Sequence, residues 1–180
     1  MKKVGKYSGA GAAGAGTAMY DDLSTMAEST TGFGSFAVEN KLKTICRQNE
    51  DCQRLLSIPG IGLLSATAIV ATISDVSVFK SGREFSAWLG LVARQHSTGG
   101  KPTLLGISKR GDSYLRTLLI HGGRTVVRVA DKYQDKRNQW ISNLEHRRGK
   151  NISAVAVANK NARIAWALLN NKTTYQVSTM

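Results

Sequence analysis

The stretch LLSIPGIGLLSATAIVATI, Leu55–Ile73, places the four residues Pro59–Gly62 between two apolar runs of helical character. Proline and glycine disfavour a continuing helix, and glycine adopts backbone angles that are closed to other residues. The pattern therefore predicts two helices joined by a tight turn. The small residues Ala66, Ala68 and Ala71 would let the first helix pack closely on the second.

This turn has two interpretations. In the first it is a helix-hairpin-helix motif, in which backbone N–H groups at the start of the second helix and the positive end of the helix dipole bind a phosphate oxygen. Such contacts grip the backbone of a nucleic acid and read no bases. In the second, Pro59–Gly62 only links two core helices.

Charge is distributed unevenly along the chain. The net charge is +13, yet residues 1–79 contain seven Lys or Arg and seven Asp or Glu, whereas residues 80–180 contain eighteen and five. A cationic half of this kind suits a polyanion, which favours the nucleic-acid interpretation of the turn. No apolar run approaches the length of a membrane span. Cys46 and Cys52 suggest neither a metal site nor a disulfide framework, and we expect two free thiols that are buried or half-buried.

The fold class expected is mostly α. A compact helical domain with helix-hairpin-helix-like turns should span residues 38–172, between a poorly ordered Gly-, Ala-, Ser- and Thr-rich arm at 1–37 and a frayed tail at 173–180. Helices are predicted at 38–58 with a break near Asn49, at 63–73, at 81–91 with Ser81 and Glu84 as a capping box, from about 112, at 133–149 and at 151–171.

Three further features belong to this prediction. Residues 92–106 contain Gly99, Gly100 and Pro102 and are predicted to be a loop. Gly122-Gly123 is a potential interruption of the helix that starts near 112, and Arg124–Ala130 has strand-like alternation. The three tryptophans, Trp88, Trp140 and Trp166, lie in apolar helical patterns and are assigned to the core rather than to base stacking.

A second glycine-bounded turn opens into a helix in GISKRGDSYLRTLL, Gly106–Leu119. Lys109 and Arg110 lie in this turn, and Arg116 lies one helical turn further on. Cations at a helix N-terminus oppose the helix dipole, and an anionic partner would remove the conflict. The alternative is ordinary surface charge.

Three segments in this order resemble one family: LLSIPGIGLLSATAIVATI, FKSGREFSAWLGLVARQHSTGGK and LLGISKRGDSYLRTLLIHGGR. They are similar to the C-terminal domain of the insertion-sequence 110 family (116/110/902 group) of bacterial transposases, over Val38 to Leu169. The resemblance implies DNA transposition by strand cleavage and transfer through a hydroxyl nucleophile, with a structured RNA that selects the DNA.

The resemblance places the nucleophile in RQHSTGGK. In the family the catalytic serine directly precedes a glycine, so Thr98 is the matching residue and Ser97 lies beside it; both are candidate catalytic residues. The methyl group of threonine stiffens its rotamer and crowds an in-line attack. The residues themselves also suit this chemistry, because His96 is a candidate base and cations flank the loop. His96 as an ordinary surface histidine is the alternative.

The resemblance further implies an acidic RuvC-like domain that binds metal. Residues 1–37 do not resemble it, so we expect a truncated transposase with no cofactor of its own, Mg²⁺ being bound only through the missing domain. The expected partners are DNA, an element-encoded guide RNA and further copies of the chain, with no membrane, at the nucleoid of the bacterial cytoplasm. The alternatives are a non-catalytic helix-hairpin-helix module and a basic RNA-associated structural protein. The candidate DNA-binding residues are Gly60, Ile61, Gly62, Arg94, Lys101, Lys109, Arg110, Gly111 and Arg116.

Overall fold

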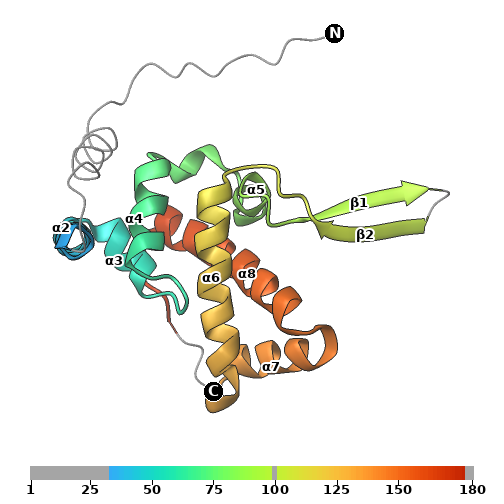
Figure 1. The fold of residues 1–180 in the computed structure, drawn as a ribbon. Coiled ribbons are helices and arrows are strands. Elements are labelled where there is room, and N and C mark those ends of the chain that lie inside the picture. Colours follow the sequence, from blue (N-terminus) through green and yellow to red (C-terminus); the bar gives the residue numbers. More distant parts are fainter. Residues whose placement is uncertain (1–32, 99–100, 177–180) are drawn as a thin grey trace, which may run out of the picture.

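The computed structural model describes residues 33–98 and 101–176, and the side chains of residues 37–97 and 103–176 (Figure 1). The predicted arm at 1–37 lies almost entirely outside these residues, as do the last residues of the predicted tail. Helix α2, Phe33–Gln48, begins within the segment that the sequence assigned to the arm. The described residues confirm a mostly α-helical, compact fold.

The first predicted helix is broken at Asn49, as expected. The Asn49 side chain accepts a hydrogen bond from the backbone N–H of Cys52 (3.0 Å) and caps α3, Glu50–Leu56. The Pro59–Gly62 turn then leads into α4, Leu63–Thr72. Cys46 and Cys52 are free thiols and both are buried, which confirms that prediction.

A short 3-10 helix, η1 (Val76–Val78), precedes α5, Gly82–Trp88. The predicted cap is present, since the Glu84 backbone N–H donates to Ser81 Oγ at 3.3 Å. The Glu84 carboxylate in return accepts the backbone N–H of Lys80, one residue before the cap, at 2.7 Å.

Helices α6, Ser113–Val129, and α8, Lys150–Asn171, cross at the centre of the molecule (Figure 1). They are linked by η2, Ala130–Lys132, and α7, Lys136–Arg148. The strand alternative at Arg124–Ala130 is wrong, because residues 124–129 complete α6 and Ala130 begins η2. Val126 and Val127 are buried in the helical packing, and this burial outweighs the strand preference of β-branched residues.

The glycine pair in α6 does not interrupt the helix. A Cβ atom on Gly123 would lie 2.4 Å from the carbonyl oxygen of Ala154, so the missing side chain lets α6 approach α8 closely. The residues of α8 at this approach, Ala154 and Ala158, are also small, and both are fully buried.

The main core lies between α8 and the helices α3 to α6, around Leu55, Ile69, Phe85 and Leu119. Burial of each such side chain contributes about 1.5–3 kcal/mol. The tryptophans are less buried than predicted. Trp88 is 39% and Trp140 37% exposed, and only Trp166 is held inward, by a hydrogen bond from Nε1 to the carbonyl of Phe79.

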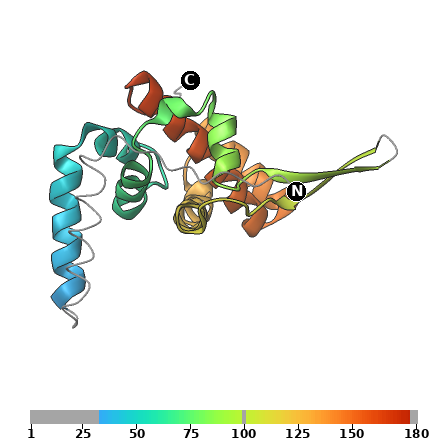
Figure 2. The same cartoon turned by 90° about the horizontal axis from the view of Figure 1, so that it is seen from above.

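The predicted loop at 92–106 is instead a β-hairpin. Strands β1, Ala93–Thr98, and β2, Lys101–Ile107, pair antiparallel with an irregularity between Ala93 and Gln95. The hairpin projects from the helical body as an arm, on the side opposite α2 (Figures 1 and 2). Residues 94–97 and 103–106 are all exposed, so no buried face produces the alternation of apolar residues that identifies a strand.

The start of the predicted tail is attached to the body. The backbone N–H of Thr173 donates to Leu168 O, and that of Tyr175 donates to Ser57 Oγ at 3.0 Å. Within the described ranges, no helix is both long enough and apolar enough to cross a bilayer.

Candidate nucleic-acid interface

The Pro59–Gly62 turn is held in place by hydrogen bonds from side chains of α7 and α8. The carbonyl oxygen of Pro59 accepts hydrogen bonds from Arg137 Nη2 (3.1 Å) and from the fully buried Asn161 Nδ2 (3.0 Å). Arg137 Nη2 also donates to Asn161 Oδ1 at 2.7 Å, so the two side chains hold each other and the turn. These contacts fix the direction in which α4 begins.

The three candidate residues of this turn have different environments. Gly60 has φ +92°, and a Cβ atom there would lie 2.6 Å from Val126 Cγ2, so it is required for packing against α6. Ile61 is buried in the core. Gly62 is exposed with nothing near its Cβ position, and its φ of −95° is open to any residue, contrary to the expectation for this glycine. Only Gly62 is therefore placed to meet a ligand.

The N-terminus of α4 has no side-chain cap. Gly62 is its N-cap residue, and no side chain accepts a hydrogen bond from the first turn. Uncapped N–H groups at a helix start are donors that a phosphate oxygen can accept, and the helix dipole favours an anion there.

The second glycine turn differs from this arrangement. Asp112 caps α6, because its carboxylate accepts the backbone N–H of Leu115 at 2.8 Å. The negative charge expected at this helix start is therefore supplied by the chain itself, through Asp112. Gly111 has φ +129°, and a Cβ atom there would lie 1.8 Å from Trp88 O. A residue without a side chain is therefore required where the chain passes close to the C-terminal end of α5.

The cations of this turn separate into two groups. Arg116 Nη1 donates to the carbonyls of Leu89 (3.3 Å) and Gly111 (3.4 Å), so the guanidinium of this half-buried residue is hydrogen-bonded to the backbone of its own chain. Lys109 and Arg110 are exposed. Lys109 also has φ +56°, a left-handed conformation unusual for a residue other than glycine.

The candidate nucleophiles lie at the far end of the hairpin. Ser97 is opposite Pro102 and Thr98 is opposite Lys101 in the register of the strands. Ser97 is exposed, and its Oγ accepts a hydrogen bond from Gln95 Nε2 at 2.9 Å. The side chains of Thr98 and Lys101 lie outside the described ones.

His96 is not placed to serve Ser97. Adjacent residues of a strand point to opposite faces, so His96, which pairs with Thr103, lies on the other face of the hairpin from Ser97. The Gln95 amide can stabilise negative charge on Ser97 Oγ, but it cannot remove the hydroxyl proton. Gln95 was not among the sequence-predicted residues; its position two residues before Ser97 would have indicated it once the segment was known to be a strand.

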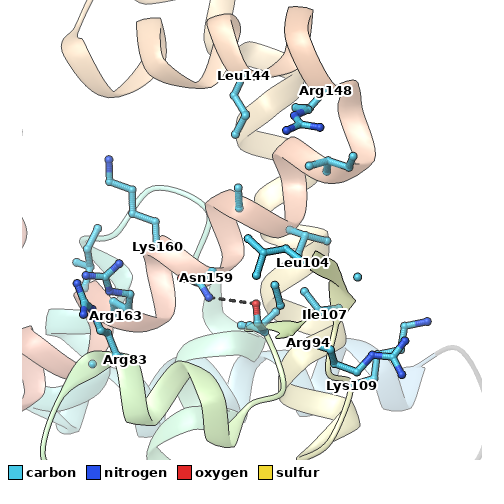
Figure 3. A pocket seen from close by; sticks show the side chains of 18 of the residues that line it. Arg83, Arg94, Leu104, Ile107, Lys109, Leu144, Arg148, Asn159, Lys160 and Arg163 are labelled. Atoms are coloured by element: carbon cyan, nitrogen blue, oxygen red, sulfur yellow. Dashed lines mark hydrogen bonds between the residues drawn. The ribbon is translucent and has the colours of Figure 1, made fainter. Parts of the chain in front are cut away.

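A groove of about 1700 Å³ opens between the base of the hairpin, α5, α7 and α8 (Figure 3). Asn159 Nδ2 donates to Leu91 O at 3.1 Å and joins α8 to the chain just before the hairpin. Among the candidates, Arg94 and Lys109 line this groove. Four further cations that were not among the candidates line it too, from α5, α7 and α8: Arg83, Arg148, Lys160 and Arg163.

The environment of Lys160 in this groove lowers its pKa. Its pKa is lowered mainly because burial penalises the charged ammonium, and additionally because Arg137 and Arg163 lie nearby. Its Nζ lies 4.3 Å from the ring centroid of Trp140 in a cation–π contact.

The described residues contain no group of three or more His, Cys, Asp or Glu side chains that could hold a metal ion.

Known proteins resemble this chain over most of its length. The profile of the Transposase IS116/IS110/IS902 family matches residues 52–139. A probable family 20 transposase of Pseudomonas aeruginosa is 53% identical over 139 residues, which are 77% of this chain and 41% of the relative. The transposase for insertion sequence element IS1111A of Coxiella burnetii is 51% identical over 138 residues, 77% of this chain and 38% of the relative. The transposase for insertion sequence element IS1328 of Yersinia enterocolitica is 41% identical over 138 residues, 77% of this chain and 41% of the relative. The chain spans about two-fifths of the length of these relatives.

Proposed function

Because the chain belongs, through residues 52–139, to the IS116/IS110/IS902 family of transposases, we propose that it binds DNA and takes part in DNA transposition. The observation that carries the proposal beyond the family is the hairpin, which holds Ser97 exposed on an arm away from the helical body (Figure 2). A non-catalytic DNA-binding module is the second candidate, supported by the uncapped start of α4.

DNA binding rests on contacts with phosphates. The uncapped N–H groups at the start of α4, next to Gly62, would donate hydrogen bonds to one phosphate oxygen, and the exposed cations Arg94, Lys109 and Arg110 would contact other phosphates. Lys101 belongs to the same set by its place at the hairpin tip. These contacts serve RNA phosphates equally, so a guide RNA is a further partner in this proposal, and transposition at the nucleoid would bring several copies together on DNA.

The proposed chemistry is attack by a hairpin hydroxyl on a DNA phosphate. The Ser97 or Thr98 oxygen forms a bond to phosphorus, the bond from phosphorus to one strand oxygen breaks, and the hydroxyl proton passes to a base. The leaving strand oxygen takes up a proton. For Ser97, the Gln95 amide would stabilise the charge that develops on the attacking oxygen, and the base must come from outside the described hairpin.

Trapping of a covalent adduct tests this chemistry. Labelled DNA from the ends of the element that encodes the chain is incubated with the chain, alone and together with the Pseudomonas aeruginosa relative whose own nucleophile has been replaced by alanine. We expect an adduct that survives denaturing electrophoresis and is lost in Ser97→Ala, in Thr98→Ala, or only in the double variant. Thr103→Ala, which removes a neighbouring exposed hydroxyl, should retain the adduct. If no adduct forms in any mixture, the non-catalytic module remains.

A matched pair of substitutions tests phosphate binding at α4. Asn and Asp are similar in shape and both are good N-cap residues, but only Asp is charged. Gly62→Asp should weaken binding to a DNA duplex about five-fold relative to Gly62→Asn, because a carboxylate at the helix start repels and replaces the phosphate. Equal affinities of the two folded variants, measured by fluorescence anisotropy, would refute this contact.

A further inference from the structure

The groove beside the hairpin concentrates positive charge without compensation. Six cationic side chains line it, and no Asp or Glu does so among the described residues: Arg83, Arg94, Lys109, Arg148, Lys160 and Arg163. Ion pairs are formed away from the groove lining, for example by Lys43, Arg54, Lys150 and Lys172. A groove that keeps six cations apart from carboxylates is suited to an anionic ligand with several charges.

The cations stand at the edges and the surface between them is apolar. Figure 3 shows Arg83, Lys160 and Arg163 along one side, Arg94 and Lys109 along the other, and Leu104 and Ile107 between them. Several large apolar side chains of this lining remain exposed: Leu104 at 71%, Ile152 at 55%, Leu105 at 45% and Trp140 at 37%. Exposed apolar groups gathered in one concave site indicate that the ligand has an apolar part as well.

We propose that this groove binds one unpaired strand of nucleic acid, with its phosphates at the cationic edges and its bases over the apolar floor. A single strand offers both chemistries side by side, because its bases are free to leave the stack. A duplex encloses its bases and presents phosphates outward, so it would leave the exposed floor of Leu104 and Ile152 without a partner. The inference rests on the proposed function, and it places an unpaired strand beside the hairpin that carries the candidate nucleophiles.

Binding of defined oligonucleotides tests the edges of the groove. The probes are labelled dT20, the corresponding U20 RNA and a 20-bp DNA duplex, measured by fluorescence anisotropy over a range of salt concentrations. Arg148→Ala/Arg163→Ala should weaken single-strand binding about ten-fold or more and lower the slope of log affinity against log salt by about 1.4, which is 0.7 for each lost contact. Duplex affinity should change less than about two-fold. The control is Arg124→Ala/Arg128→Ala, which removes two exposed cations of α6 outside the groove lining and should leave single-strand affinity unchanged.

A second variant tests the floor independently of charge. Ile152→Ser removes an apolar side chain that is already 55% exposed, so folding is not at risk. It should weaken dT20 or U20 binding about three-fold or more without changing the salt slope. Binding of either strand should also quench the fluorescence of Trp140, and Trp140→Phe should lose that part of the signal.

The outcomes separate this inference from the proposed function. Loss of affinity for dT20, for U20 or for both, without an equal loss for the duplex, supports binding of an unpaired strand in the groove. The single strand whose affinity falls more identifies DNA or RNA as the ligand. Equal losses for duplex and single strands, or no loss in either groove variant, overturn the inference and leave the apolar floor to a protein ligand. A folded chain that binds none of the three probes refutes the proposed DNA binding itself.

Discussion

At the scale of single residues, the two glycines Gly60 and Gly122 meet where the Pro59–Gly62 turn rests on α6. A Cβ atom on Gly122 would lie 1.8 Å from the carbonyl oxygen of Gly60, far inside contact distance, and the neighbour is backbone rather than a flexible side chain. The turn that the sequence singled out for ligand binding therefore depends first on a packing contact with a residue 62 positions away.

Gly122→Ala should consequently destabilise the fold. Alanine gains helix propensity over glycine, by about 1 kcal/mol, but overpacking against the turn should cost more and give a net loss of about 2 kcal/mol or more. Urea denaturation measures the free energy of unfolding. Gly106→Ala is the matched control, because nothing lies within 4 Å of its Cβ position, and it should change stability by less than about 0.5 kcal/mol. Equal stability of the two variants would contradict the contact.

The roles of Gly60 and Gly122 could not be predicted from the sequence. Gly60 and Gly62 lie in the same short turn and look equivalent in the sequence. They differ in the structure because α6, which is distant in sequence, packs against Gly60 and not against Gly62. The same holds for Arg116, read from sequence as a phosphate contact and found donating to carbonyls of its own chain. Asp112 was overlooked as the partner of this helix start, although Asp before a helix is a local cap signal.

The buried thiols provide a prediction at the same scale. Burial, and then the hydrogen bond and proximity to Cys46, raise the pKa of Cys52 to about 12. The unfolded chain loses this proton near pH 9 and the folded chain does not, so the contribution to stability is complete below pH 9 and falls as pH rises towards 12. The difference in unfolding free energy between the wild type and Cys52→Ala should shrink over that range. A constant difference would contradict the shift.

At the scale of elements, most helices could be predicted and the hairpin could not. Asn49, Ser81 and Gly149 mark helix ends through local contacts, and each boundary is found where the sequence indicated it. The hairpin buries no face, so its strands carry no apolar alternation, and the glycines and proline near its tip favoured a loop. The antiparallel pairing of β1 and β2 is therefore apparent only in the structure.

The hairpin should therefore be removable without loss of the fold. Its stem is held by the backbone N–H of Ser108 on Val92 O (2.8 Å) and that of Lys109 on Gly90 O (3.1 Å), which lie outside the arm. Replacement of residues 95–104 by a short Gly-Ser turn should leave the melting temperature within a few degrees of the wild type, because little apolar area is lost. Circular dichroism checks this. The shortened chain should form no covalent DNA adduct, and unfolding on excision would refute the independence of the arm.

At the scale of the whole molecule, the net charge of +13 is carried by residues 80–180, yet only part of it is free to meet DNA. The amount and distribution of charge follow directly from the sequence. The sequence does not show which cationic side chains hydrogen-bond to the protein's own backbone and which are exposed. Arg110 and Arg116 illustrate the difference, since Arg110 is exposed and Arg116 hydrogen bonds to backbone carbonyls beneath α5. A count of basic residues therefore overestimates the number of phosphates that the protein can neutralise.

Substitution of these two arginines separates the roles. Arg110→Ala should lower the slope of log affinity for duplex DNA against log salt by about one, because one phosphate contact and its released counterion are lost, and should leave the free energy of unfolding nearly unchanged. Arg116→Ala should keep that slope and cost about 1–3 kcal/mol of stability, because carbonyls that its guanidinium satisfies are left without a donor. Salt titrations of anisotropy and urea denaturation of the same two variants measure both quantities. If Arg116→Ala lowers the slope and Arg110→Ala lowers stability, the assignment of inward and outward cations is reversed, and the charged face that we propose for DNA would have to be drawn on other residues.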